Sequence, residues 1–190
     1  RLVTYTIEKS GDYNGVRIRW NKQLTLPFRY SDVYDRHRNK HISTKWLNLP
    51  LHKAKYIVKG LVDTDGCKGE KELTFDNTSR ILCESLRFLL LRMGVPTSGY
   101  VRDRVGESHL TDRGEITNKQ VSYCLRIPRT EEISKLLELD NDKQGQFFKF
   151  FSYGSYVMSR VKSIKESSYS GTLYDLEMPQ THDYMIHQGL

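Results

Sequence analysis

The chain has 190 residues, of which 30 are Lys or Arg and 23 are Asp or Glu, so its formal net charge is +7. Hydrophobic residues make up 37% of the chain and aromatic residues 11%, which excludes a disordered protein and favours one globular domain or two small ones. The three cysteines show no Cys-x-x-Cys spacing, which argues against a zinc ribbon and indicates reduced thiols in an intracellular protein. No apolar run approaches the roughly 20 residues that cross a bilayer, so we expect no membrane partner. The positive balance favours an anionic partner, with nucleic acid first.

Two strands and a short helix are predicted in the first 50 residues. Residues 2–8 and 16–22 alternate between apolar and polar side chains, which is typical of strands with one buried face. Arg17 and Arg19 lie on the polar face of the second strand. A short helix is predicted near residues 31–38.

Residues 51–139 carry stronger signals. The predicted elements in chain order are a helix over 51–65 that Gly66 ends, a short strand around 73–75, a helix from an N-cap near 77–79 to Gly94, strands over 98–105 and 120–127 joined by a polar loop, and a last helix opening at 128–130. This order predicts an α+β fold with an antiparallel sheet.

The pattern changes after residue 140. Short strand-like segments follow at 156–158, 161–164, 173–178 and 183–187, which is typical of an all-β unit. We therefore expect a domain boundary between Asp140 and Tyr153.

The segment 56–66, Tyr-Ile-Val-Lys-Gly-Leu-Val-Asp-Thr-Asp-Gly, resembles the signature of the LAGLIDADG homing endonucleases. The match rests on Gly60, the apolar pair after it, Asp63, Asp65 and Gly66. In that family the helix ends by delivering one carboxylate to the DNA, and Asp65 holds that position here. A carboxylate at a helix C-terminus faces the negative end of the helix dipole, and a divalent cation would remove this penalty. The resemblance therefore implies Asp65 as catalytic residue and Mg²⁺ ligand of an enzyme that cleaves double-stranded DNA.

An Asp-x-Asp-Gly after a helix is also a common turn, in which both carboxylates are merely solvated. Two further segments favour the family. Residues 88–95 resemble the end of its second helix, and residues 42–50 resemble the approach to the second motif in two-motif members. The resemblance covers residues 40–139 and implies an endonuclease half with a saddle-like antiparallel sheet, in which Gly60 lets two such helices approach closely.

Basic residues recur on one face of the predicted strands. Such a face could lie in a major groove and reach base edges and phosphates, although a solvated sheet face explains any single arginine equally well. The candidate DNA-binding residues are Arg17, Arg19, Lys59, Tyr100, Arg102, Arg104 and Arg126.

The last twenty residues, 171–190, resemble the C-terminal splicing block of an intein. The match rests on a Tyr-Asp-Leu-Glu strand, a His seven residues after the Asp, an aromatic residue two positions later, and a Gly before the final apolar residue. By this resemblance Asp175 tunes the nucleophiles and His182 assists cyclisation of a terminal Asn, a role that suits the near-neutral pKa of histidine. A surface histidine and a strand-edge charge are the alternative.

The two resemblances together imply three parts: residues 1–50 as the tail of a first endonuclease half, 51–145 as the LAGLIDADG domain, and 146–190 as the C-terminal part of an all-β, Hint-like splicing domain. Residue 1 is Arg and residue 190 is Leu, where an intein has a nucleophile and an Asn, so we expect no splicing from these 190 residues alone. The implied partners are double-stranded DNA, an N-terminal intein fragment and the host exteins, and the location follows the host protein. Two alternatives stay open: a degenerate endonuclease that serves only as an assembly piece for splicing, and a free-standing homodimeric endonuclease.

Overall fold

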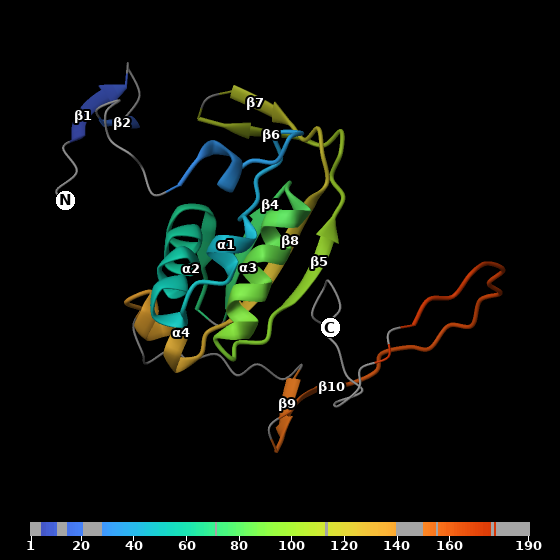
Figure 1. Ribbon diagram of the computed structural model, residues 1–190. Coiled ribbons are helices and arrows are strands. Elements are labelled where there is room, and N and C mark those ends of the chain that lie inside the picture. Colours follow the sequence, from blue (N-terminus) through green and yellow to red (C-terminus); the bar gives the residue numbers. More distant parts are fainter. Residues whose placement is uncertain are drawn as a thin grey trace.

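The computed structural model describes residues 5–10, 15–20, 28–70, 72–112, 114–139, 150–154, 156–175 and 177. Figure 1 shows the arrangement of its elements. They are β1 (Tyr5–Ser10), β2 (Gly15–Trp20), the 3-10 helix η1 (Tyr30–Asp32), α1 (Thr44–Leu47), α2 (Leu51–Asp65), β3 (Gly66–Lys68), β4 (Glu72–Asn77), α3 (Arg80–Arg92), β5 (Ser98–Arg102), β6 (Ser108–Thr111), β7 (Gly114–Thr117), β8 (Ser122–Pro128), α4 (Glu131–Leu136), β9 (Phe150–Tyr153) and β10 (Tyr156–Ser159).

The helix α2 has the bounds that its sequence predicts. Ala54, Val58 and Val62 recur at helical spacing and are buried, so one face of the helix joins the core. Gly66 follows the last turn in an extended conformation, and a Cβ there would lie 2.5 Å from the carbonyl oxygen of Val62. The chain can therefore leave α2 sharply and enter β3 directly after Asp65.

The sheet has four antiparallel strands in the order β3-β4-β8-β5, which confirms the predicted α+β fold. Leu73 and Phe75 of β4 and Leu125 and Ile127 of β8 share one face and are buried. Helices α2 and α3 pack on this face, as Figure 1 shows. The opposite face of the sheet is not covered by these helices.

The ends of α3 and α4 follow the predicted capping signals. The hydroxyl of Ser79 accepts a hydrogen bond from the Leu82 amide at 3.3 Å, and that of Thr130 accepts one from the Ile133 amide at 3.3 Å. Gly94 follows α3 with a φ of +75°, a left-handed conformation that favours glycine after a helix. Both helices therefore begin or end where the local chemistry directs.

Three predictions in the first 130 residues are wrong in detail. The helix expected near residues 31–38 is only the 3-10 turn η1. The strand expected over 98–105 ends at Arg102, because its partner β8 begins at Ser122 and offers no further residue to pair with. The expected polar loop between them contains the β6–β7 hairpin, and β3 was not predicted.

The strands near the two ends of the chain form separate hairpins. In the β1–β2 hairpin, Glu8 pairs with Arg17 and Thr6 with Arg19 along the backbone. The β9–β10 hairpin joins Phe150–Tyr153 to Tyr156–Ser159.

The strand predicted at 161–164 is wrong, and the strand predicted at 173–178 is wrong over its described part, 173–175, since residues 160–175 hold neither helix nor strand. Val161, Ile164 and Leu173 are exposed there, so no second apolar surface covers them, and a lone strand without a partner is unstable. Residues 178–190, with the strand expected at 183–187, lie outside the described residues.

Across the described part of the chain, no helix combines the length and the apolar character that a membrane crossing requires.

Candidate active site and nucleic-acid interface

Asp65 is the last residue of α2, and its side chain is 42% exposed. The nearest basic group is the ammonium of Lys40, whose Nζ lies 3.7 Å from Oδ2 of Asp65. Lys40 is held in place by its backbone, because its carbonyl accepts a hydrogen bond from the hydroxyl of Ser79 at the start of α3. The end of α2 thus presents one accessible carboxylate beside one accessible ammonium.

Asp63, the other acidic residue of the motif, is already paired. Its Oδ1 lies 2.6 Å from Nζ of Lys68, and its Oδ2 lies 3.3 Å from Nζ of Lys59. The hydrogen bond from Lys68 lowers the pKa of Asp63 below its ordinary value, with a smaller contribution from Lys59. Asp63 therefore serves the structure at the end of α2, and Asp65 is the more available carboxylate.

The contacts of Lys59, a candidate DNA-binding residue, do not favour a role in DNA binding. Its ammonium also lies 3.5 Å from Oε1 of Glu138, beyond the end of α4. Partial burial lowers its pKa, but Asp63 and Glu138 outweigh this effect and raise the pKa overall. In this structure Lys59 ties α2 to the chain after α4.

The uncovered side of the four-stranded sheet, here called the polar face, is lined by alternate residues of its strands. The strand register places Thr74 beside Arg126 and Arg126 beside Ser98, and places Asp76 beside Cys124 and Cys124 beside Tyr100. The residues of the polar face are Cys67, Glu72, Thr74, Asp76, Ser98, Tyr100, Arg102, Ser122, Cys124 and Arg126. Three of the predicted DNA-binding residues, Tyr100, Arg102 and Arg126, are thereby brought together.

Both arginines of the polar face are ion-paired with acids of β4. Nη1 of Arg102 lies 3.2 Å from Oδ2 of Asp76, and Nη2 of Arg126 lies 2.9 Å from Oε1 of Glu72. Arg102 also donates from Nη2 to the Tyr100 hydroxyl at 2.6 Å, which raises the pKa of Arg102, and both guanidinium groups lie within 6 Å of the Tyr100 ring centroid. These guanidinium groups are oriented before any ligand binds, but their charge is largely matched.

The structure does not bring the other predicted residues to this face. Arg104 lies beyond the end of β5, where its Nε is 3.8 Å from Oε2 of Glu107. Arg17 and Arg19 belong to β2, which is part of a separate two-stranded sheet. Asp175 is exposed in the segment without regular structure, and His182 lies outside the described residues.

The donor set at Asp65 can be compared with the needs of Mg²⁺. Among the described residues, no group of three His, Cys, Asp or Glu side chains could enclose a metal ion. Mg²⁺ is nevertheless commonly held by one or two carboxylates together with phosphate oxygens and water. An exposed carboxylate such as Asp65 fits that pattern only as a shared site, completed by the substrate or by a second protein segment.

A cavity of about 440 Å³ lies next to this carboxylate. Its lining is mostly apolar: Phe28, Asp32, Val33, Tyr34, Lys40, His41, Ile42, Trp46, Ile57, Leu61, Asp65 and Leu82. Such a lining does not suit phosphate, so the candidate DNA-facing surfaces are the polar face and the exposed side chains around Asp65.

Sequence reasoning missed Lys40, Glu72 and Asp76. Lys40 belongs to a basic stretch that the sequence shows plainly, but only the tertiary fold brings it to Asp65. The acids of β4 could have been found from the alternation around Leu73 and Phe75, which places them on the face opposite the core. Their pairing with Arg126 and Arg102 depends on strand register, which the sequence does not define.

Comparison with known proteins agrees with this geometry. Residues 53–139 match the sequence model of the LAGLIDADG-like domain. The chain is 42% identical over 62 residues to the ATP-dependent DNA helicase Hel308 of Methanocaldococcus jannaschii, a match that covers 32% of this chain and 5% of the helicase. It is 36% identical over 144 residues to a DNA polymerase of Thermococcus litoralis, covering 63% of this chain and 8% of the polymerase.

The chain thus spans less than a tenth of the length of either protein. The family match begins in α2 and ends after α4, so it contains Asp65, the whole four-stranded sheet, α3 and most of α2. The expected resemblance is therefore confirmed at the level of the domain, and residues 53–139 of this chain are a LAGLIDADG-like domain.

Proposed function

We propose that this chain is part of an intein that carries a homing endonuclease, and that its LAGLIDADG-like domain cleaves double-stranded DNA at a specific site. The observation that carries the proposal is the accessible Asp65 carboxylate at the end of α2, beside Lys40 and next to the sheet. The family match over residues 53–139 supports it.

The two protein matches support the proposal that this chain is a segment inserted into host proteins. A helicase and a polymerase are different enzymes, yet each shares a segment of less than a tenth of its length with this chain. A mobile segment that is carried within different host proteins would give this pattern.

In the proposed reaction the polar face lies in a major groove, where Arg102 and Arg126 reach base edges. Asp65 would hold a divalent cation, and that cation would supply Lewis-acid stabilisation of charge at the phosphate. Lys40 places its ammonium against the same phosphate group and offsets the negative charge that the reaction concentrates there. Tyr100 keeps the two guanidinium groups oriented.

The proposed enzyme needs a second LAGLIDADG helix. Gly60 is exposed on α2, and apart from the adjacent residues and backbone of the helix itself, no heavy atom of the described residues lies within 4 Å of the position that a Cβ would occupy. A partner helix could therefore approach this point backbone to backbone. In the proposed organisation residues 1–50 belong to the end of a first endonuclease half that supplies this helix, and 51–145 form the second half.

The proposed splicing role belongs to residues 146–190. Asp175 and His182 would act in the C-terminal cleavage step, with His182 exchanging a proton near neutral pH. The N-terminal intein segment and the exteins are the partners that complete this domain.

The test of the nuclease compares Asp65→Asn with the wild type in the full intein that contains this chain. The substrate is a duplex made by joining the coding sequences on either side of the intein, with Mg²⁺ present. We expect wild-type cleavage, its loss on adding EDTA, and at least a 100-fold slower rate for Asp65→Asn. The control is Glu132→Gln, which also removes one negative charge, at an exposed position on α4. This variant should cleave DNA at the wild-type rate.

Two results would contradict the proposal. Normal cleavage by Asp65→Asn would remove Asp65 from the reaction. Absence of wild-type cleavage from an intein that still splices would instead favour a degenerate endonuclease that serves only for assembly.

A further inference from the structure

Residues 34–40, here called the basic turn, form a small ordered hairpin before α1. A backbone bridge joins Tyr34 to Lys40. Within the turn, Oδ1 of Asp35 accepts hydrogen bonds at 2.8 Å from the amides of His37 and Asn39, and Oδ2 accepts one at 3.0 Å from the Asn39 side chain. The bond from that side chain is the main cause that lowers the pKa of Asp35. The turn is thus organised from within by its one acidic residue.

Arg36 and Arg38 project from this turn and are exposed. Arg38 adopts a φ of +63°, and Nε of Arg36 donates to Nε2 of His37 at 3.0 Å. Within the ranges that the structure describes, neither guanidinium forms an ion pair. The turn therefore carries three basic side chains, with Lys40 as the third, against one carboxylate that is engaged in its own hydrogen bonds.

The basic turn differs in this respect from the polar face. Arg102 and Arg126 are matched by Asp76 and Glu72, and Arg104 beyond β5 is matched by Glu107. Because no carboxylate of the described residues forms an ion pair with Arg36 or Arg38, their charge is available to backbone phosphate, where contacts position a protein without reading sequence. The two surfaces therefore differ in the part of a duplex that each can bind.

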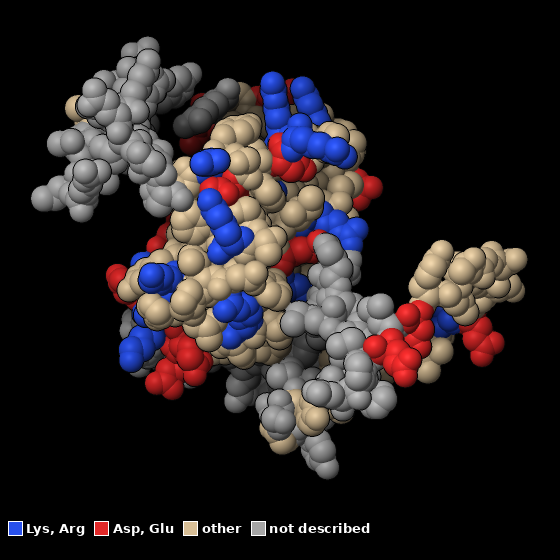
Figure 2. Space-filling view, in the orientation of Figure 1, with Lys and Arg blue, Asp and Glu red and all other residues tan. Residues whose placement is uncertain are grey.

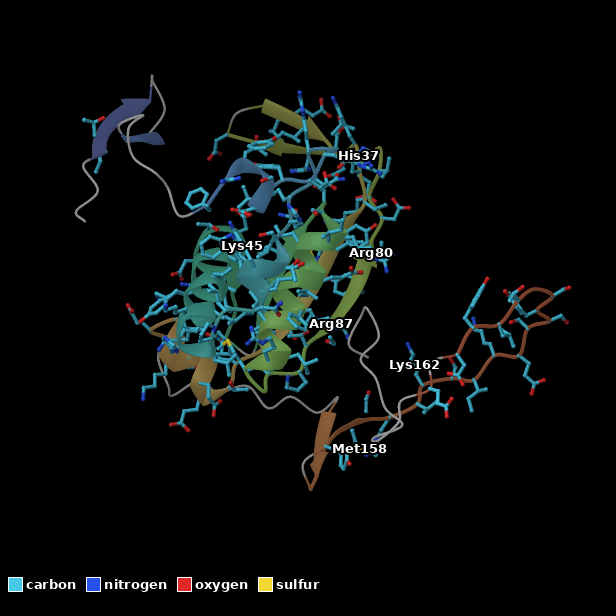
Figure 3. The ribbon with its side chains drawn as sticks, viewed as in Figure 1. His37, Lys45, Arg80, Arg87, Met158 and Lys162 are labelled. Atoms are coloured by element: carbon cyan, nitrogen blue, oxygen red, sulfur yellow. The ribbon has the colours of Figure 1, made fainter. Side chains whose placement is uncertain are left out.

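The basic turn also lies close to the candidate active site. Its last residue, Lys40, is the one whose ammonium lies 3.7 Å from Asp65. In Figure 3 the turn, marked by His37, lies at the end of the molecule that also carries the β6–β7 hairpin, and Lys and Arg side chains gather at that end in Figure 2. A backbone phosphate near Asp65 would have its strand neighbours within reach of the turn.

We propose that the basic turn is a phosphate-binding element, in which Arg36 and Arg38 contact the backbone of the DNA strand that Asp65 acts on. The inference rests on the proposed function, since the ligand is duplex DNA. Each guanidinium can make paired hydrogen bonds to one phosphate. The turn then contributes affinity and strand position without reading sequence.

The test measures DNA binding by the full intein as a function of salt concentration, with a target duplex and with a duplex of scrambled sequence. Each phosphate contact contributes about 0.9 to the slope of log K against log salt. We expect Arg36→Gln/Arg38→Gln to make the slope shallower by about 1 to 2 and to weaken both duplexes by the same factor. Arg36→Lys/Arg38→Lys keeps the charge and should retain the wild-type slope.

The control removes the same charge elsewhere. Lys53→Gln/Lys135→Gln changes exposed residues at the start of α2 and on α4, and should leave the slope within error of wild type. If the slope became equally shallow in this control, the effect would be due to net charge alone, and the proposal would be overturned.

Two further results would overturn the inference but leave the nuclease proposal intact. One is an unchanged slope for Arg36→Gln/Arg38→Gln while the wild type cleaves. The other is a loss of affinity confined to the target duplex, which would make the turn a base reader. A wild-type protein that binds no DNA would overturn both proposals, and Asp65→Asn, which should bind but not cleave, separates binding from catalysis.

Discussion

Asp32 connects the two ends of the segment that carries the basic turn. This carboxylate is 6% exposed, and it accepts hydrogen bonds from the Arg29 amide at 2.7 Å and from the Ser43 hydroxyl at 3.1 Å. Nζ of Lys45 lies 2.6 Å from its Oδ2, and Lys45 is labelled in Figure 3. The bond from Lys45 and that from the Arg29 amide hold the pKa of Asp32 well below its usual range. One buried acid thus fixes η1 against α1 and places the turn between them.

Asp32→Asn should lower the free energy of unfolding at neutral pH. It should also make that free energy fall less steeply as the pH is lowered. Because the pKa of Asp32 is depressed in the folded chain, its contribution is fully present above the unfolded pKa of about 4. This contribution is lost as the pH falls from about 4 towards the folded pKa. Urea unfolding of wild type and variant at pH 7 and pH 3 should show a larger difference at pH 7. Asp112→Asn, at an exposed position, should show little difference at either pH, and an equal effect of Asp32→Asn at both would contradict the assignment.

At the scale of the element, α2 presents one face to the core, and we propose that the face with Gly60 meets a partner helix. Gly60→Ala tests this division. An exposed helical Gly→Ala change stabilises a helix by about 1 kcal/mol, and no atom obstructs the new methyl group here. We therefore expect the melting temperature of this chain to stay the same or rise while DNA cleavage by the full intein falls, because the methyl group separates the two helices. A lower melting temperature together with normal cleavage would show that Gly60 serves this half alone.

The elements that the sequence predicts well are those with strong local signals. The helices α2 and α3 have apolar residues at helical spacing and a Gly just after the last turn, so their bounds agree closely with the structure. The β6–β7 hairpin has strands of four residues that are almost wholly exposed, so no alternation marks them. The strands expected at 161–164 and 173–178 have a strand-like composition, but a strand also needs a neighbour, and composition does not supply one.

The candidate site also has a part that local sequence patterns predict and a part that they do not. Asp65 follows from a motif at the end of a helix, and the shared face of Tyr100 and Arg102 follows from strand alternation. The pairing of Asp65 with Lys40, and of Arg126 with Glu72, joins residues that are distant in sequence. Such contacts depend on how α3 and the sheet position the chain, which no local pattern encodes.

At the scale of the whole molecule, the proposal assigns two reactions to separate parts of one chain. In this proposal DNA cleavage would depend on Asp65, in the domain that the family match covers, whereas splicing would depend on Asp175 and His182, which lie beyond it. The two sets of proposed residues do not overlap. The two functions should therefore be separable by single substitutions.

His182→Ala provides the complementary variant to Asp65→Asn. In a precursor with the N-terminal segment and both exteins, we expect it to slow C-terminal cleavage by about 100-fold or more, since general acid–base groups typically contribute 10²–10⁴-fold. DNA cleavage by the same protein should be unchanged. His109→Ala, on the exposed β6 strand, is the matched control and should splice normally. Normal C-terminal cleavage by His182→Ala would remove this histidine from splicing, and a simultaneous loss of both reactions would mean that the two parts fold as one unit whose failure stops each of them.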